Sequence, residues 1–165
     1  MVVVDQVEDP AQAVGMVKRA VTRIETPGTV VREDDPAQVF IAAIAAPVKR
    51  KQRFGFALMD LGCADFRCTA FDTLAEALEE LRRLGVCELL IPEGMELPLG
   101  SFDGALVEVA ADWFARRSAA AQVKSFIGVG DLAGFGLSSS PDRLAAAGAL
   151  ARYVQATRVD AIEFV

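Results

Sequence analysis

The chain has 165 residues, enough for one domain or for one domain and part of a second. Hydrophobic residues make up 53% of it and the mean hydropathy is +0.33, which supports a sizeable core and excludes extended disorder. The formal net charge of −6 has the wrong sign for an independent binder of nucleic-acid backbone, and the absence of histidine removes the commonest general base and most zinc-ligand sets.

The first thirty residues carry strand, helix and turn signals in close succession. The β-branched Val2–Val4 favour a strand. Asp9 and Pro10 suit the cap and first turn of a helix, and Val21–Ile24 suit a second short strand. Residues 26–29 (TPGT) interrupt regular structure, because proline fixes φ and glycine tolerates positive φ. We therefore expect a β-α-β tail from an incomplete domain.

A polar, acidic link at residues 32–36 marks the domain boundary, so we assign residues 1–30 to the tail and residues 31–165 to a second domain. The apolar run at 39–46 fits a buried strand or a short helix, and periodicity alone does not separate the two. Its position before two clear strands favours a strand.

Two further strands are expected at 54–61 and 65–71, joined by a tight turn at 62–64. Residues of the second strand alternate between two faces. Phe66, Cys68 and Ala70 fall on one of these faces. With the strand at 39–46, these segments complete an antiparallel three-stranded meander.

The remaining sequence alternates helices and strands. Asp72 and Thr73 open a helix that presents a leucine stripe and ends at Gly85. The elements expected after it are a strand at 88–93 that can lie parallel to the first strand of the meander, a loop at 94–104, a strand at 105–109, a helix at 112–127 anchored at its start by Trp113 and Phe114, a connector at 128–136, and a helix at 141–157 capped by Ser140. This βββαβαβα order predicts an α/β fold with a mixed five-stranded sheet of the ribonuclease-H-like kind.

No segment of the sequence predicts a membrane span or a secretory leader. The longest apolar stretch, residues 39–48, contains Pro47 and is far shorter than the ~20 residues that a bilayer requires. Cys63, Cys68 and Cys87 lack the spacing of a metal site and fit reduced thiols. We therefore expect a cytoplasmic protein.

Several passages resemble the bacterial MutS DNA-repair ATPases. QVEDPA at residues 6–11 and TPGT at 26–29 are similar to the family's EQ-x-EDP and TPGT, which stand at the end of the mismatch-recognition domain. The passages that are similar to the family's second, connector domain are FGFALMD at 54–60, DFR at 65–67, ELLIPE at 88–93, DLAGFG at 131–136 and AAAGAL at 145–150. LGCA at 61–64 departs from the usual IS-S/T-G of the family, and residues 94–118 do not align with it.

The resemblance implies a non-catalytic connector domain of ribonuclease-H-like fold, which links mismatch recognition to the ATPase core. The family's base-wedging Phe-x-Glu motif and its P-loop are missing from this sequence, so we expect neither mismatch readout nor an enzyme in this chain. No cofactor is expected here, since ATP and Mg²⁺ belong to the full-length family members. An expressed fragment, a truncated gene product and a stand-alone relative with its own partner all fit the resemblance.

The implied partners are the remaining MutS domains, a MutL-type protein and, only within the full-length protein, DNA. The resemblance places the MutL-docking face on the helix at 112–127, with Gln122 and Lys124 as candidate contacts. A basic cluster at a hairpin tip is a candidate contact for DNA backbone or for an acidic partner, and its members are Lys49, Arg50, Lys51 and Arg53. A plain solvated surface is the competing interpretation for each group. The exposed edges of the tail make pairing with a second copy of the chain a further candidate.

A ribonuclease-H-like sheet also raises a Mg²⁺-dependent nuclease as the alternative function. That chemistry needs carboxylates clustered at the centre of the sheet. The strand at 39–46 has none, and Asp60 and Asp65 flank a turn, where they stabilise the turn or face solvent. The glycines of 128–136 follow a helix, which favours helix termination over a phosphate-binding loop. We therefore expect no catalytic residue and no metal site.

Overall fold

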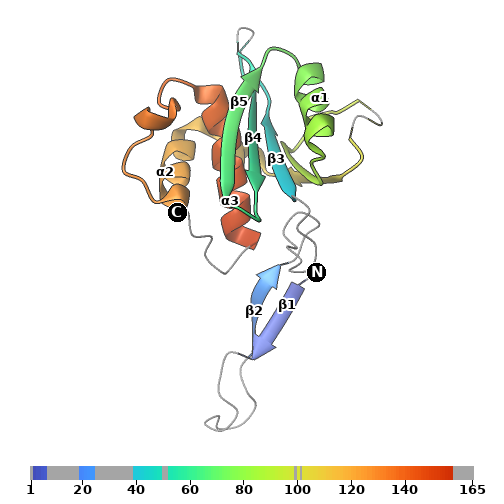
Figure 1. Ribbon diagram of the computed structural model, residues 1–165, viewed down its shortest axis with the longest axis vertical. Coiled ribbons are helices and arrows are strands. Elements are labelled where there is room, and N and C mark those ends of the chain that lie inside the picture. Colours follow the sequence, from blue (N-terminus) through green and yellow to red (C-terminus); the bar gives the residue numbers. More distant parts are fainter. Residues whose placement is uncertain are drawn as a thin grey trace.

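The computed structural model describes residues 2–6, 19–24, 39–49, 52–98, 100 and 102–157. Strands β1 (Val2–Gln6) and β2 (Arg19–Ile24) form an antiparallel pair with a register shift between Val3 and Val4 (Figure 1). The two predicted tail strands are thus confirmed. The predicted helix start at Asp9 and the TPGT interruption lie outside the described residues.

The main domain is built on a five-stranded sheet with the order β5-β4-β3-β6-β7. Its strands are β3 (Phe40–Ala45), β4 (Phe54–Asp60), β5 (Asp65–Phe71), β6 (Glu88–Pro92) and β7 (Ala105–Val109). The first three form the predicted antiparallel meander, and β6 and β7 continue the sheet in parallel on the other side of β3. The expected mixed sheet of ribonuclease-H-like topology is confirmed. The helix between β5 and β6 carries the chain back across the sheet, which makes parallel pairing possible.

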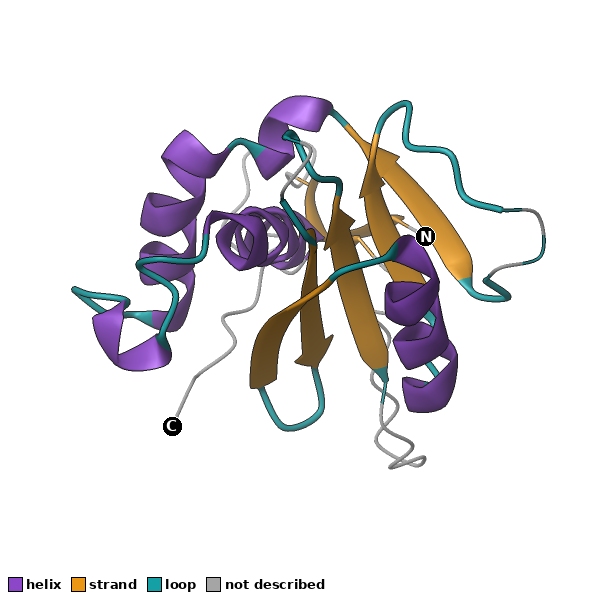
Figure 2. Cartoon of the chain, turned by 90° about the horizontal axis from the view of Figure 1, so that it is seen from above, coloured by secondary structure: helices purple, strands orange, loops and turns teal. Residues whose placement is uncertain are grey.

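Helices cover both faces of this sheet (Figure 2). Helix α1 (Leu74–Leu84) packs on one face, and helices α2 (Arg116–Ile127) and α3 (Pro141–Thr157) pack on the other. Alternate residues of β3 enter the two cores, and its residues 41–45 are buried throughout. Burial on both faces explains the unbroken apolar run in its sequence.

Helix α1 has the ends that its sequence predicts. Thr73 accepts the backbone N–H of Glu76, whose carboxylate accepts the N–H of Thr73, and Gly85 ends the helix with φ 64°. These contacts satisfy backbone groups that have no partner inside the helix. Leu78 and Leu81 are buried against the sheet, as the predicted stripe requires.

The helix predicted at 112–127 is wrong at its start. Residues Ala111–Phe114 form a short 3-10 turn, η1, and Ala115 is extended, so α2 begins at Arg116. Trp113 and Phe114 precede the helix and pack beside the α2–α3 core. The guanidinium of Arg152 lies 4.3 Å from the centre of the Trp113 ring, which fixes the turn against α3.

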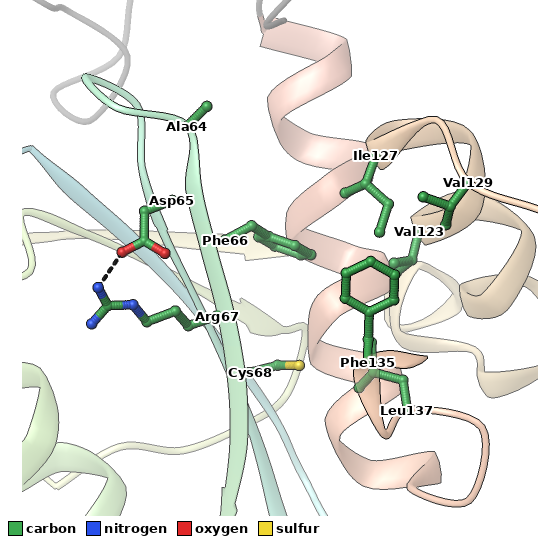
Figure 3. A pocket seen from close by; sticks show the side chains of 10 residues that line it. All are labelled: Ala64, Asp65, Phe66, Arg67, Cys68, Val123, Ile127, Val129, Phe135 and Leu137. Atoms are coloured by element: carbon green, nitrogen blue, oxygen red, sulfur yellow. Dashed lines mark ion pairs between the residues drawn. The ribbon is translucent and has the colours of Figure 1, made fainter. Parts of the chain in front are cut away.

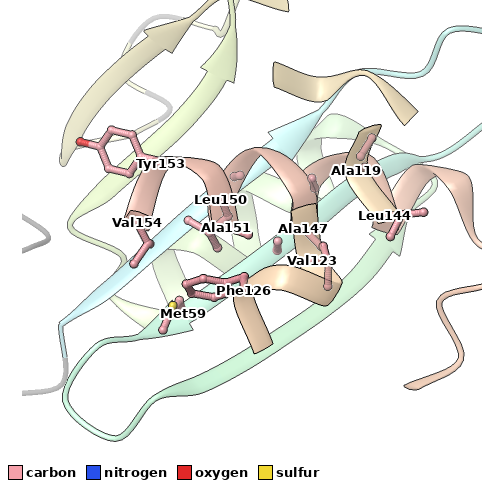
Figure 4. Close-up of a cluster of buried hydrophobic side chains, with 14 of the residues drawn as sticks. Met59, Ala119, Val123, Phe126, Leu144, Ala147, Leu150, Ala151, Tyr153 and Val154 are labelled. Carbon is pink, nitrogen blue, oxygen red and sulfur yellow. The ribbon is translucent and has the colours of Figure 1, made fainter. Parts of the chain in front are cut away.

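Helix α3 is buried on nearly every side, as its small residues predict (Figure 4). A Cβ built on Gly148 would lie 2.7 Å from the Cβ of Ala119, so α2 and α3 touch at their backbones. The predicted connector holds one short 3-10 turn, η2 (Ala133–Phe135). Within the described residues, no helix has both the length and the apolar character needed to cross a bilayer.

Candidate docking surface beside helix α2

Gln122 and Lys124, the predicted docking residues, project from two flanks of α2, since side chains two positions apart on a helix do not share a face. The Gln122 amide donates a hydrogen bond to Oε1 of Gln155 on α3 at 2.5 Å. Lys124 lies half-buried in the last turn of α2, where a cation interacts favourably with the helix dipole. Gln122 therefore joins the two helices, while Lys124 stands on the other flank. Their role in docking stays a prediction.

An open cavity of about 590 Å³ lies between β5, the second half of α2 and the segment that follows it (Figure 3). Phe66 and Cys68 point into it from β5, while Asp65 and Arg67 point away and form an ion pair with each other. The other side chains that line it are apolar: Ala64, Val123, Ile127, Val129, Phe135 and Leu137.

This cavity has two features of a contact surface. Phe135 at its rim is 57% exposed, which is unusual for a large apolar side chain. Strand β5 is an edge strand within the described part of the chain, so the cavity lies at the border of the sheet. Lys124 is not among the residues that line the cavity; it precedes the lining residue Ile127 by about one turn of α2. The sequence placed Phe66 and Cys68 on the same face of β5 but did not predict the cavity, because the segment 129–137 reaches it only in the folded chain.

The basic cluster at 49–53 is only partly described. Lys49 and Arg53 are exposed, and Nε of Arg53 lies 2.7 Å from the Asp72 carboxylate. Arg50 and Lys51 lie outside the described residues. Sequence reasoning missed Gln52, whose side-chain oxygen accepts hydrogen bonds from the backbone N–H groups of Val48 and Lys49. No periodic or charge signal marks this glutamine in the sequence.

The acidic residues considered for catalysis have structural contacts. The Asp60 carboxylate is buried and accepts the Gly62 N–H at 2.8 Å, which confirms a turn-stabilising role. Sequence reasoning missed Glu88, which is fully buried and accepts a hydrogen bond from the Tyr153 hydroxyl at 2.5 Å. Its signal was a lone acid at the start of an apolar strand. In the part of the chain that the structure describes, no three His, Cys, Asp or Glu side chains lie together as a metal site.

The three cysteines are free thiols. Burial raises the pKa of Cys68, and burial together with the charge of Glu88 raises the pKa of Cys87. A raised pKa lowers the thiolate fraction near neutral pH, so these two sulfurs are poor nucleophiles. Cys63, in the turn between β4 and β5, is the exposed one.

Comparison with known proteins gives a consistent set of similarities. The model of MutS domain I matches residues 1–34, and the model of MutS domain II matches residues 39–163. The DNA mismatch repair protein MutS of Syntrophobacter fumaroxidans is 33% identical over 169 residues, which cover 98% of this chain and 19% of that protein. The chain thus spans about a fifth of the length of this curated relative. A solved structure of T. thermophilus RuvC in complex with a Holliday junction substrate matches 72% of this chain and 96% of its own, with 14% identity and a TM-score of 0.46.

Proposed function

The chain belongs to the MutS family of DNA mismatch repair proteins, and we propose that it is the connector portion of such a protein, preceded by the end of its mismatch-recognition domain. In this role it links mismatch recognition to the ATPase core and offers a docking surface to a MutL-type protein. Because the sequence has neither a P-loop nor the family's base-wedging Phe-x-Glu motif, the ATP, the Mg²⁺ and the mismatched DNA of the family would be held elsewhere in the whole protein.

The observation that carries this proposal is the match of MutS domain II to residues 39–163, the segment that forms the five-stranded domain. The polar groups of this domain support a role in contact and positioning. Asp60 holds a turn, Asp65 pairs with Arg67, and Glu88 accepts from a tyrosine. Free cysteines fit a reducing compartment, so a cytoplasmic location is part of the proposal.

The docking part of the proposal rests on the surface beside α2. Protein interfaces gain most of their affinity from a few anchors that enter apolar pockets, within a polar rim. The cavity beside β5 supplies such a pocket, and Lys124 supplies a cation on α2 about one turn before the lining residue Ile127. We propose that a MutL-type protein places an apolar side chain in this cavity and an acidic group near Lys124.

The test is a calorimetric titration of this chain with the MutL-type protein of the same organism. Substitution of Lys124→Glu or Phe135→Asp is expected to weaken binding at least about tenfold, which corresponds to roughly 1.4 kcal/mol. Gln122→Ala is expected to weaken it less, because the Gln122 amide is engaged with Gln155. The matched control is Glu79→Lys, a charge reversal on the exposed side of α1, across the sheet from the cavity.

Each outcome of this titration has a distinct meaning. Binding that none of the α2-side variants changes would move the docking surface to another part of the chain. Binding that Glu79→Lys changes as strongly as Lys124→Glu would point to overall charge instead of a site. A complete lack of binding by the wild-type chain would leave only the linking role.

The β1–β2 pair supports a further part of the proposal. Within the described residues these strands pair only with each other, and a two-stranded sheet is marginally stable by itself. We propose that another strand adds to an open edge, from the rest of the recognition domain or from a second copy of the chain. Analytical ultracentrifugation over a concentration series separates the two, since only self-association raises the mass with concentration.

A further inference from the structure

Three segments far apart in the sequence meet through polar side chains at the end of the sheet where β4 begins. Arg116, the first residue of α2, donates to Oδ1 of Asp142 in the first turn of α3 at 2.7 Å. The same nitrogen of Arg116 also donates to Oε1 of Gln52, just before β4, at 3.0 Å. The second carboxylate oxygen of Asp142 accepts the backbone N–H of Arg53 at 3.3 Å. One arginine and one aspartate thus tie the β3–β4 connection to the starts of two helices.

Gln52 also forms hydrogen bonds with the backbone of the β3–β4 connection. Its side-chain oxygen accepts the N–H of Val48 at 3.0 Å and the N–H of Lys49 at 2.8 Å, and its own N–H donates to the carbonyl of Lys49 at 2.8 Å. The side-chain amide of Gln52 therefore contacts both the backbone of the turn and the guanidinium of Arg116. Removal of the arginine would take away one of the three groups that donate to the side-chain oxygen of Gln52.

The Arg116–Asp142 pair is more sheltered than the Arg53–Asp72 pair. The two side chains are 26% and 16% exposed, whereas those of Arg53 and Asp72 are 52% and 73% exposed. Partial burial reduces screening by water and salt, so the sheltered pair holds its geometry better. The backbone of Asp142 also packs tightly against β4, because a Cβ built on Gly55 would lie only 1.9 Å from the Asp142 carbonyl oxygen. The start of α3 thus rests directly on the backbone of β4.

We propose that Arg116 is a positioning residue: acting through Gln52 and Asp142, it locks the β3–β4 turn to the first turns of α2 and α3. The turn carries Lys49 and Arg53, so the lock sets the direction in which these cations meet an anionic partner. Because Arg116 is also the first residue of α2, the same contact joins this helix to the described residues of the turn. These contacts of Arg116 do not depend on the identity of any partner. They can be tested separately from the docking of a MutL-type protein.

Amide hydrogen exchange, read residue by residue by NMR on the full chain, tests this directly. In Arg116→Met, the amides of Val48, Lys49 and Arg53 are expected to exchange at least about tenfold faster, while those of Ala57 and Met59 inside β4 keep their wild-type rates. Arg116→Lys keeps a cation beside Asp142 and is expected to restore part of the protection. Arg117→Met is the matched control, since it removes the same charge from an exposed neighbour.

A second variant separates the contacts made through Gln52 from those made through Asp142. It remains informative if Arg116→Met does not fold. Gln52→Ala is expected to release the amides of Val48 and Lys49 but to leave that of Arg53 protected, because Asp142 still accepts it. The proposal is overturned if these amides keep their rates in both variants. It is also overturned if Arg116→Met and Arg117→Met act alike, or if the faster exchange extends equally through β4.

Discussion

The two faces of the five-stranded sheet are covered in opposite ways. On one face, α1 lies alone and fills the core with large side chains such as Leu78 and Leu81, opposite Phe56 and Leu58 of β4. On the other face, α2 and α3 lie together, and α3 contributes mainly alanines around Gly148. A single helix needs bulk to fill the space above a sheet, whereas two helices that share a face need small residues at their contact.

The difference matters for what each face can do. The α1 face is filled by the buried leucines of α1 together with the strand residues opposite them. The α2–α3 face brings two helices into backbone contact and leaves the cavity beside β5 open at its border. Hydrogen bonds of Gln122 and Arg116 to side chains of α3 then set the relative position of the two helices. The candidate docking residues belong to this second face.

Leu81→Ala is expected to have the largest effect, because it removes a fully buried side chain from the face that depends on bulk. The free energy of unfolding should fall by about 2–5 kcal/mol, from lost burial and the cavity left behind. Urea unfolding followed by circular dichroism measures the change. Leu74→Ala, at a partly buried position of the same stripe, should cost less. Equal losses at the two sites would contradict the account of the α1 face.

Gly148→Ala tests the opposite requirement of the α2–α3 face. The added Cβ would meet Ala119 at 2.7 Å, so we expect a loss of about 1–3 kcal/mol in spite of the better helix propensity of alanine. Chemical denaturation of this variant, of Ala119→Gly and of the double variant gives a thermodynamic cycle. The double variant should be more stable than the sum of the single losses, because it removes one of the clashing atoms. Strict additivity would show that the two helices do not meet here.

Thr73→Ala should have a moderate effect on the α1 face. It removes the side-chain oxygen that caps the helix and is expected to cost about 0.5–2 kcal/mol. Thr73→Ser keeps the cap and serves as the control in the same denaturation experiment. A loss in Thr73→Ser equal to that in Thr73→Ala would assign the effect to the missing methyl group instead of the cap.

The thiols are expected to give the smallest effect, and their reaction rates report on the cavity side of the sheet. Because burial raises the pKa of Cys68, its thiolate forms at higher pH than that of an ordinary cysteine, and its reaction should begin later as the pH rises. The rates of disulfide exchange with a small aromatic disulfide, measured from pH 7 to 9 on single-cysteine variants, should place exposed Cys63 ahead of Cys68. A Cys68 that reacts as fast as Cys63 would contradict the expected effect of burial on its thiol.

Local signals predicted much of this fold, and particular residues show why. Thr73, Glu76 and Gly85 act within a few positions of one another, so the ends of α1 were visible in the sequence. The start of α2 was misplaced because the apolar Trp113 and Phe114 come just before the helix, although both lie in a 3-10 turn beside the α2–α3 core and Trp113 is held by Arg152. The contacts of Arg116 with Gln52 and Asp142 leave no local pattern, because these partners lie 64 and 26 positions from it in the sequence.

The sequence by itself determined the strand and helix order, the two-faced burial of β3 and the resemblance to MutS, since these depend on side-chain chemistry and spacing along the chain. Only the tertiary structure decided the cavity beside β5, the backbone contact at Gly148 and the side chains that meet at Arg116. Each of these joins segments from different elements, and their relative placement follows from packing across the sheet, which no single stretch of sequence encodes.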